Sequence, residues 1–239
     1  MNYVSTTLSE WDSAFTQSFD SATKGGSALI ASLRRNLLAE IGHWLQLHVA
    51  AVFYDFSKFF DTIKIAELID RAADTQYPPV DMALALQQHL APRVIQAEGF
   101  SGFHMCIHNS ILAGCKQSVS MTRALLYQSM YTLHATHKKV YTGIHVDDIA
   151  LLASSESKLK VYHRARAASL HFASMARKQR LGLSEKGAIV ASDFSLALRL
   201  QRELNKQGVP YKAEYVSRDL GLAFNAACKK TYTNLKNRL

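Results

Sequence analysis

The chain has 239 residues, and 48% of them are hydrophobic, so it is long enough to bury a real core and is not a disordered tail. Its 28 Lys and Arg outnumber its 19 Asp and Glu, and the net charge of +9 suits a polyanionic partner such as nucleic acid. The three cysteines form no CxxC pair and have no zinc-finger spacing, which argues against a disulfide framework and favours a reducing compartment.

No apolar run approaches the roughly 20 residues of a membrane span, and the N-terminus lacks the character of a signal peptide. We therefore expect an intracellular protein of the cytoplasm or nucleus that is neither secreted nor bound in a membrane. No repeat divides the chain. Residues 1–239 are predicted to form a single domain, with residues 1–26 as a loosely structured lead-in that contains one short helix.

An amphipathic helix is predicted from Ser27 onward, because apolar residues recur at helical spacing. The residues expected to face the core are Leu29, Ile30, Leu33, Leu37, Ile41, Trp44 and Leu45. Residues 48–54 then predict a buried strand that delivers Asp55 to its carboxyl end. Asp61 is expected to cap the following helix rather than bind a ligand, and a second helix is predicted over 80–90.

Two β-like runs, 93–98 and 103–110, predict a hairpin with a four-residue loop. The segment 113–121 leads into a further helix, whose expected core residues are Thr122, Leu125, Leu126, Met130 and Leu133. Gly114 allows close approach of the backbone, and the start of a helix favours phosphate. This region is therefore a candidate for contact with a phosphorylated ligand.

The segment 141–154 predicts a tight hairpin, because two β-prone runs flank only the adjacent carboxylates Asp147 and Asp148. Adjacent carboxylates repel each other unless a cation occupies the tip. Magnesium is the natural candidate, since it takes hard oxygen ligands and is usually held by one or two carboxylates together with substrate phosphates. The alternative is a solvated Asp-Asp turn, which tolerates such residues without any ligand.

Residues 156–180 predict a long helix with many basic side chains, for which a solvated surface is the simplest interpretation. Its expected inward residues are Leu159, Tyr162, Ala165, Phe172 and Ala176. A loop and strand follow over 183–192, and then a helix that Asp193 caps. The runs 211–217 and 220–224 predict a hairpin around Arg218 and Asp219.

Asp55 ends an apolar strand just as the paired aspartates end another, so the two acidic sites could converge. Polymerases hold two metal ions about 3.5–4 Å apart between such carboxylates. The stretch 53–63 resembles motif A of reverse transcriptases, and 145–153 resembles motif C. The variety that the chain looks most like is the non-LTR (LINE-type) retrotransposon enzyme. Segments 113–121, 183–192 and 220–221 resemble motifs B, D and E, in the family's order.

The resemblance implies an α+β fold, namely the fingers and palm of a right-hand polymerase with an antiparallel palm sheet backed by helices. It also implies an RNA-directed DNA polymerase with RNA template, DNA primer and dNTP as partners. By position, Asp55, Asp147 and Asp148 would hold two Mg²⁺ ions, and Lys186 would donate a proton to pyrophosphate. Four residues would contact substrate, namely Phe56 through its main-chain carbonyl, Phe60 against the ribose 2′-OH, Gln117 and Lys116.

Alternatives exist for several of these roles. Phe60 is also explained as a core aromatic, and Lys186 as a solvated turn residue. Lys116 and Ser118 depart from the family's motif B, the early fingers motifs have no clear counterpart, and a thumb is expected to be missing. A catalytically inactive retroelement remnant that only binds nucleic acid is therefore the second hypothesis. A metal-dependent hydrolase that uses the same carboxylates is a weaker third.

Overall fold

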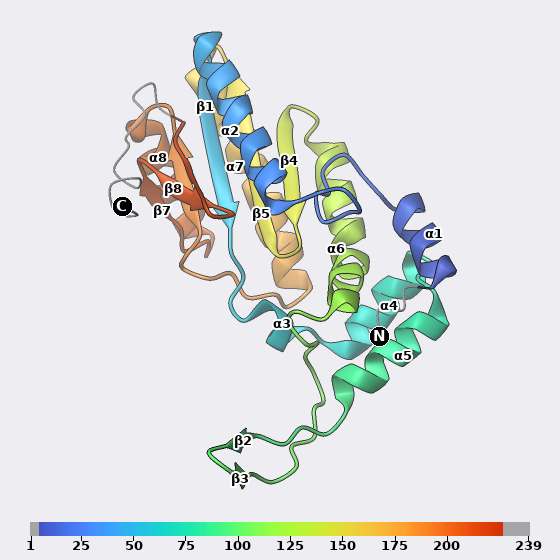
Figure 1. Ribbon diagram of the computed structural model, residues 1–239. Coiled ribbons are helices and arrows are strands. Elements are labelled where there is room, and N and C mark those ends of the chain that lie inside the picture. The colour runs from blue at the N-terminus through green and yellow to red at the C-terminus, as the bar shows by residue number, and fades with distance from the viewer. Residues whose placement is uncertain (1–4, 227–239) are drawn as a thin grey trace. The chain divides into compact units, whose positions relative to one another are not determined.

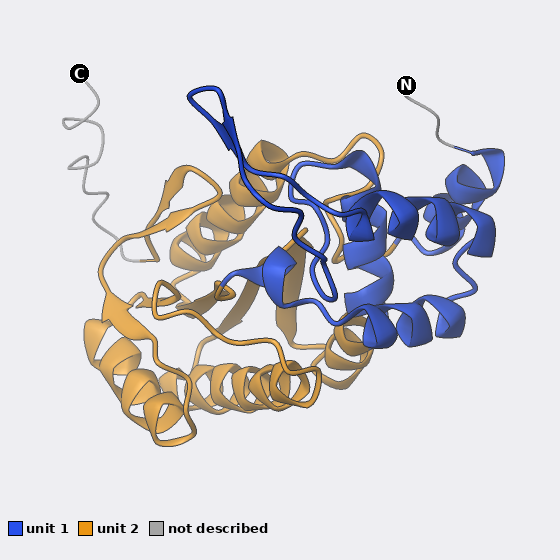
Figure 2. Ribbon diagram, turned by 90° about the horizontal axis from the view of Figure 1, so that it is seen from below, with its two compact units in different colours: residues 1–16, 58–128 blue, residues 17–57, 129–239 orange. Residues whose placement is uncertain are grey.

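A computed structural model describes residues 5–226, and within them the chain divides into two compact units. Unit 1 contains 5–16 and 58–128, and unit 2 contains 17–57 and 129–226 (Figure 2). From the sequence we expected one domain over 1–239, with 1–26 as a loose lead-in. Residues 5–26 are instead divided between the two units. The final residues, where we expected a thumb to be missing, lie outside the described part.

Unit 1 is mainly helical. Its elements are α1 (Thr6–Ala14), α3 (Phe59–Thr62), α4 (Ile65–Asp74), α5 (Pro79–Leu90), β2 (Gln96–Ala97), β3 (Phe100–Ser101) and the first part of α6 (Lys116–Thr136). The lead-in is anchored, because the buried Trp11 of α1 donates a hydrogen bond from Nε1 to the carbonyl oxygen of Thr75 at 2.8 Å. The five core residues predicted for α6 are all buried, as expected.

Three predictions for unit 1 were wrong. Asp61 does not cap α4, since it lies inside α3 and Lys64 precedes α4. The hairpin turns at Glu98 and Gly99, and its strands are two residues long because both are exposed and pack on no layer. Helix α6 begins at Lys116, earlier than predicted.

Unit 2 is built on a five-stranded sheet in the order β4-β5-β1-β6-β7. The strands are β4 (Val140–His145), β5 (Asp148–Ser155), β1 (His48–Tyr54), β6 (Ala188–Ala191) and β7 (Lys212–Glu214). Every neighbouring pair is antiparallel except β6 and β7, which run parallel. The expected antiparallel sheet is therefore present with one parallel pair at its edge.

Helices cover both faces of this sheet (Figure 1). Helix α2 (Ala28–Trp44) packs on one face together with the hairpin of β8 (Ser217–Asp219) and β9 (Leu222–Phe224). Helices α7 (Lys158–Lys178) and α8 (Phe194–Lys206) pack on the other. Alternation along β1 sends Phe53 toward α2 and β9, and Tyr54 toward Phe172 of α7.

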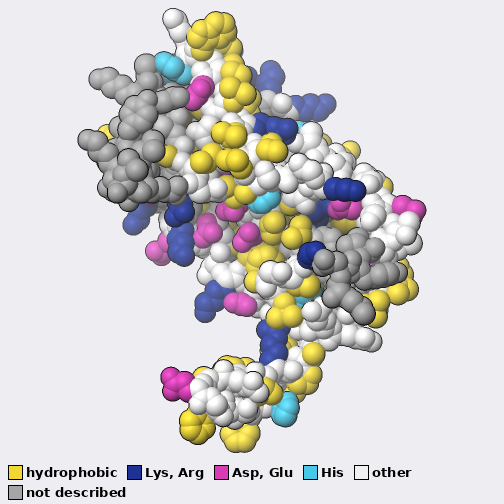
Figure 3. Space-filling model, viewed as in Figure 1, with side chains coloured by type: hydrophobic (Ala, Val, Ile, Leu, Met, Phe, Trp, Pro, Cys, Tyr) yellow, Lys and Arg dark blue, Asp and Glu magenta, His cyan; other side chains and the backbone are white. Residues whose placement is uncertain are grey.

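Helix α2 forms over the predicted residues but buries the face opposite to the one we expected. The side chains of Leu37 and Trp44 are 56% and 81% exposed, and Figure 3 shows hydrophobic side chains gathered along this helix. The buried side is made of small residues together with Arg35, and a Cβ on Gly42 would lie 2.6 Å from Val49 Cγ2. Small residues let the helix approach the sheet closely. The periodicity of the apolar residues does not show that the small-residue face is the buried one.

Two further predictions in unit 2 need correction. Leu159 of α7 is 53% exposed, although the other four residues expected to face inward are buried. The last hairpin does not turn at Arg218 and Asp219, because its turn consists of Leu220 and Gly221, both with positive φ. Residues 212–214 instead join the main sheet beside β6. Asp193 does cap α8, as predicted.

Candidate active site

A hairpin forms between β4 and β5 as predicted, but its turn lies one residue earlier than the predicted Asp147 and Asp148. His145 pairs with Asp148, so the turn contains only Val146 and Asp147, and Val146 has a φ of 59°. Asp148 is therefore the first residue of β5, and Asp147 lies in the turn itself. A two-residue turn with a left-handed first position matches the twist of the flanking strands.

The register between β1 and β5 brings Asp55 beside Asp148. The last pair along these strands is Tyr54 with Ile149, so Asp55 follows the end of β1 at the same end of the sheet where Asp148 begins β5. Phe53 and its partner Ala150 both belong to the core on the α2 side, so alternation places Asp55 and Asp148 on that same face.

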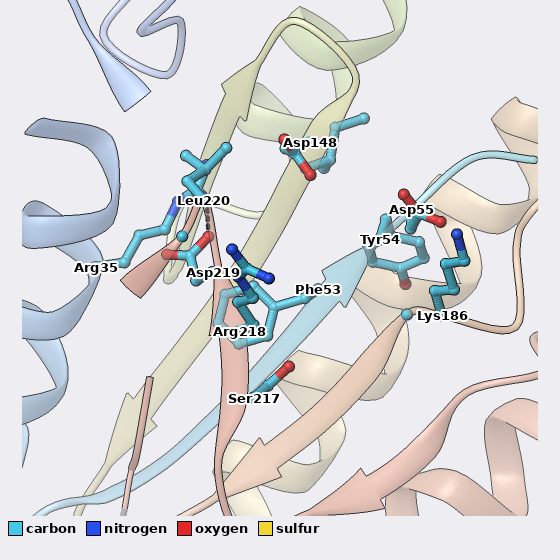
Figure 4. Close-up of a pocket in the computed structure, with 13 residues that line it drawn as sticks. Arg35, Phe53, Tyr54, Asp55, Asp148, Lys186, Ser217, Arg218, Asp219 and Leu220 are labelled. Carbon is cyan, nitrogen blue, oxygen red and sulfur yellow. Dashed lines mark hydrogen bonds and ion pairs between the residues drawn. The ribbon is translucent and has the colours of Figure 1, made fainter. Parts of the chain in front are cut away.

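Both carboxylates line a cavity of about 340 Å³ (Figure 4). Lys186 lines it too and lies beside Asp55 in the close-up, and Arg218 projects toward the cavity from β8. The remaining wall includes Arg35 from α2 and the turn of the β8–β9 hairpin. Acidic and basic side chains thus line the same cavity. This arrangement suits a ligand that carries both a cation and phosphate groups.

The loop that carries Lys186 is fixed to the segment that carries Asp55. Ser184 donates from its backbone N–H to the carbonyl oxygen of Asp55 at 2.8 Å, and Ser57 donates in the same way to Gly182 at 2.8 Å. Gly187 lies against the ring of the buried Tyr211, so closely that a Cβ would come within 2.2 Å of it. These backbone contacts hold the loop so that Lys186 lies beside Asp55.

Burial and mutual repulsion act on the paired aspartates. Burial, followed by the charge of Asp147, raises the pKa of Asp148 from 3.8 to about 6, although Arg35 opposes the shift. Burial also raises the pKa of Asp147, and the charge of Asp55 adds to that effect. Carboxylates that resist ionisation in this way gain most from a bound cation.

Two of the three predicted metal ligands line the cavity. Among residues 5–226, no group of three or more His, Cys, Asp and Glu side chains is arranged to hold a metal ion. Asp55 and Asp148 nevertheless offer adjacent hard oxygen ligands at a cavity, and Mg²⁺ is commonly held by one or two carboxylates plus substrate phosphates. Asp147 does not line the cavity and lies next to it in the turn.

The other predicted substrate contacts are distributed between the two units. The side chain of Phe56 is buried, and its backbone bridges to Leu183. Phe60 is half-buried in unit 1 and packs edge-on against Phe59, with ring centroids 5.3 Å apart. Lys116 and Gln117 occupy the first turn of α6, where Lys116 is exposed.

Sequence reasoning missed Arg35 and assigned Asp219 to a turn. Arg35 is only 1% exposed and forms an ion pair with the buried Asp219. A signal for this did exist. The small residues Ala31, Ser32, Ala39 and Gly42 recur at helical spacing around Arg35, and they mark the face of α2 that approaches the sheet.

The fold of this chain has counterparts among solved structures, and one of them is a telomerase, a reverse-transcriptase-related polymerase. It is an apo telomerase from Candida tropicalis, truncated from its C-terminal domain, which matches with a TM-score of 0.54 and 11% sequence identity. The match covers 78% of this chain but 39% of the telomerase chain. Such identity shows the fold alone, so the chain has a reverse-transcriptase-like fold.

No family model matches the sequence, and no curated protein matches it. In the part of the chain that the structure describes, none of the helices is long and apolar enough to cross a membrane.

Proposed function

We propose that this chain is the fingers and palm portion of an RNA-directed DNA polymerase of the non-LTR retrotransposon kind. The observation that carries the proposal is the placement of Asp55 and Asp148 on neighbouring strands, on one face of the sheet and in one cavity with Lys186. The reverse-transcriptase-like fold supports the same class of reaction. The net charge of +9 favours a nucleic-acid partner.

In this reaction the 3′-oxygen of a primer attacks the α-phosphorus of a deoxynucleoside triphosphate, and the bond to pyrophosphate breaks. Asp55 and Asp148, with Asp147 beside them, would hold two magnesium ions. When bound, such ions activate the attacking oxygen and stabilise the charge that develops on the leaving group. Lys186 stands at the same cavity, where its ammonium group would give a proton to the departing pyrophosphate.

Primer extension tests the proposal. The purified chain, supplied with an RNA template, a DNA primer, dNTP and Mg²⁺, should add nucleotides. Asp148→Asn should reduce the rate about 100-fold or more, because a metal contributes several kcal/mol to such a transition state. Asp70→Asn is the matched control, since Asp70 is an exposed carboxylate on α4 in unit 1. Incorporation that survives Asp148→Asn would exclude this site as the centre of the reaction.

The second candidate is a remnant that binds nucleic acid without extending a primer. It is favoured by the departures from the family pattern at Lys116 and Ser118. Ser118 is 1% exposed, and its hydroxyl donates to the carbonyl oxygen of Leu112 at 2.6 Å. Ser118 therefore adds no side chain to the surface of unit 1, and the departure that does change this surface is the exposed Lys116. Salt-sensitive binding of RNA with no incorporation by the wild-type chain would support the remnant.

A further inference from the structure

An ion pair between Arg35 and Asp219 closes one side of the cavity. Arg35 Nη1 binds Asp219 Oδ1, and the two residues are 1% and 3% exposed. Both line the same cavity as Asp148, and the close-up shows the pair joined across the gap between α2 and β8 (Figure 4). The pair therefore borders the candidate active site without belonging to any motif that the sequence analysis singled out for catalysis.

Asp219 is held to α2 by its backbone as well as by its side chain. Ser32 Oγ donates a hydrogen bond to the carbonyl oxygen of Asp219 at 2.9 Å, one helical turn before Arg35. The next two residues, Leu220 and Gly221, form the left-handed turn of the hairpin and line the cavity. The position of this turn relative to the carboxylates is thus set through Asp219.

The pair is poorly suited to a role in stability alone. Arg35 Nε and Nη2 and Asp219 Oδ2 are buried and have no hydrogen-bond partner among the residues that the structure describes. Removing charges from water is expensive, and a buried ion pair with unmet hydrogen bonds is often no more stabilising than an apolar pair of similar volume. These three atoms are also closed to solvent, although both residues line the cavity.

We propose that Arg35 and Asp219 are positioning residues of the carboxylate site. Their directional ion pair fixes the Leu220–Gly221 turn against the cavity, and their opposite charges keep the wall beside Asp148 electrically balanced. The proposal rests on the proposed function, because the substrate that the turn would help to position is the primer of that reaction. Arg35 is thereby assigned a role from outside the recognisable motifs.

The double variant Arg35→Met/Asp219→Leu separates positioning from packing. It leaves no lone buried charge, so it should fold with a Tm equal to or above that of the wild type. An apolar contact has no preferred direction, so the turn should lose its fixed position. We expect the KM for primer to rise about tenfold with a smaller change in kcat. The control is Arg166→Met/Glu203→Leu, an ion pair of 3.7 Å between α7 and α8 on the sheet's other face.

Single variants test the charge balance, with Mg²⁺ alone as the probe. Arg35→Met leaves a net negative charge beside the carboxylates and should tighten Mg²⁺ binding about threefold or more, whereas Asp219→Asn should weaken it by a similar factor. Arg35→Lys keeps the charge but loses the planar fork, so Mg²⁺ affinity should be retained while the KM for primer rises.

Hydrogen exchange at Leu220 and Gly221 gives a readout that does not depend on polymerisation. The double variant should exchange these amides faster than the wild type, while the control variant should not. If the wild type and Asp148→Asn are equally inactive, the proposed function fails, and the exchange rates still test the pair. If the double variant has the same exchange rates and the same KM for primer as the wild type, the pair only fills space and the proposal is overturned.

Discussion

Asp55, which directly follows β1, and Asp148, the first residue of the neighbouring β5, line the same cavity at one end of the sheet. Ninety-two residues separate them along the chain, yet the register leaves them no other place. Burial and the charge of Asp147 raise the pKa of Asp148 to about 6, so ionised carboxylates destabilise this end of β1 and β5 unless something neutralises them. The predictions below start from that cost.

The first prediction concerns the pH dependence of folding. The pKa of Asp148 is raised, chiefly by burial, from 3.8 to about 6. Between about pH 4 and about pH 6 the folded chain therefore keeps a proton that the unfolded chain has released, so this group lowers stability as pH rises through that window. After allowance for solvent screening of a half-buried group, Asp148→Asn should stabilise the apoprotein by about 1–2 kcal/mol near pH 7.5, and hardly at all near pH 4.

Denaturant unfolding without Mg²⁺ at the two pH values measures this difference. Asp20, whose pKa burial also raises to about 6, contributes the same slope to the wild type and to the variant, so it cancels in the comparison. Asp70→Asn serves as the control. A stability difference between Asp148→Asn and the wild type that does not vary with pH would contradict the prediction.

The second prediction concerns the proton donor. Lys186→Met should lower kcat about 100-fold with little change in the KM for dNTP, because general acid catalysis contributes typically 10²–10⁴-fold and acts on the leaving group. Single-turnover primer extension separates the two constants. Lys178→Met removes an exposed lysine at the end of α7 and should behave as the wild type. An equal loss of kcat in both variants would show that the overall positive charge of the chain matters, and not proton transfer from Lys186.

The third prediction compares two glycines of the loop that carries Lys186. Gly187→Ala would place a Cβ within 2.2–2.6 Å of three ring atoms of the buried Tyr211. The ring cannot move aside in a packed core, so unfolding should become easier by about 1–3 kcal/mol. Gly182→Ala is the control, since its Cβ would meet Ser57 Cβ at an ordinary 3.9 Å. Thermal unfolding distinguishes them, and equal Tm values would refute the close contact.

The fourth prediction separates the two interpretations of Phe60. If Phe60 excludes the ribose 2′-OH, Phe60→Ala should admit ribonucleotides at least tenfold more readily while the fold is retained. Phe60 is only half-buried in unit 1, whereas its neighbour Phe59 is 3% exposed. Phe59→Ala should therefore destabilise the chain by about 3–5 kcal/mol without changing sugar selection. A loss of stability in Phe60→Ala with unchanged selection would favour the core interpretation.

Local sequence determined most of the elements in unit 2. β1 occupies the predicted residues 48–54, because a continuous apolar run with turn signals on both sides has few alternatives. The hairpin between β4 and β5 also followed from two β-prone runs that flank only a pair of carboxylates, although its turn is Val146 and Asp147 and not the predicted Asp147 and Asp148. The Asp193 cap of α8 was equally local.

Tertiary structure decided which face of each element is buried and which distant residues meet. The apolar stripe of α2 gave the helix but not its orientation, because small residues at Ala31, Ala39 and Gly42 permit a closer approach to the sheet than the leucines do. Because this face of α2 packs on the sheet, Arg35 is buried against Asp219. A periodic pattern specifies a helix and its two faces. Which face is buried depends on the sheet surface that the helix packs against, and that surface exists only once the sheet has formed.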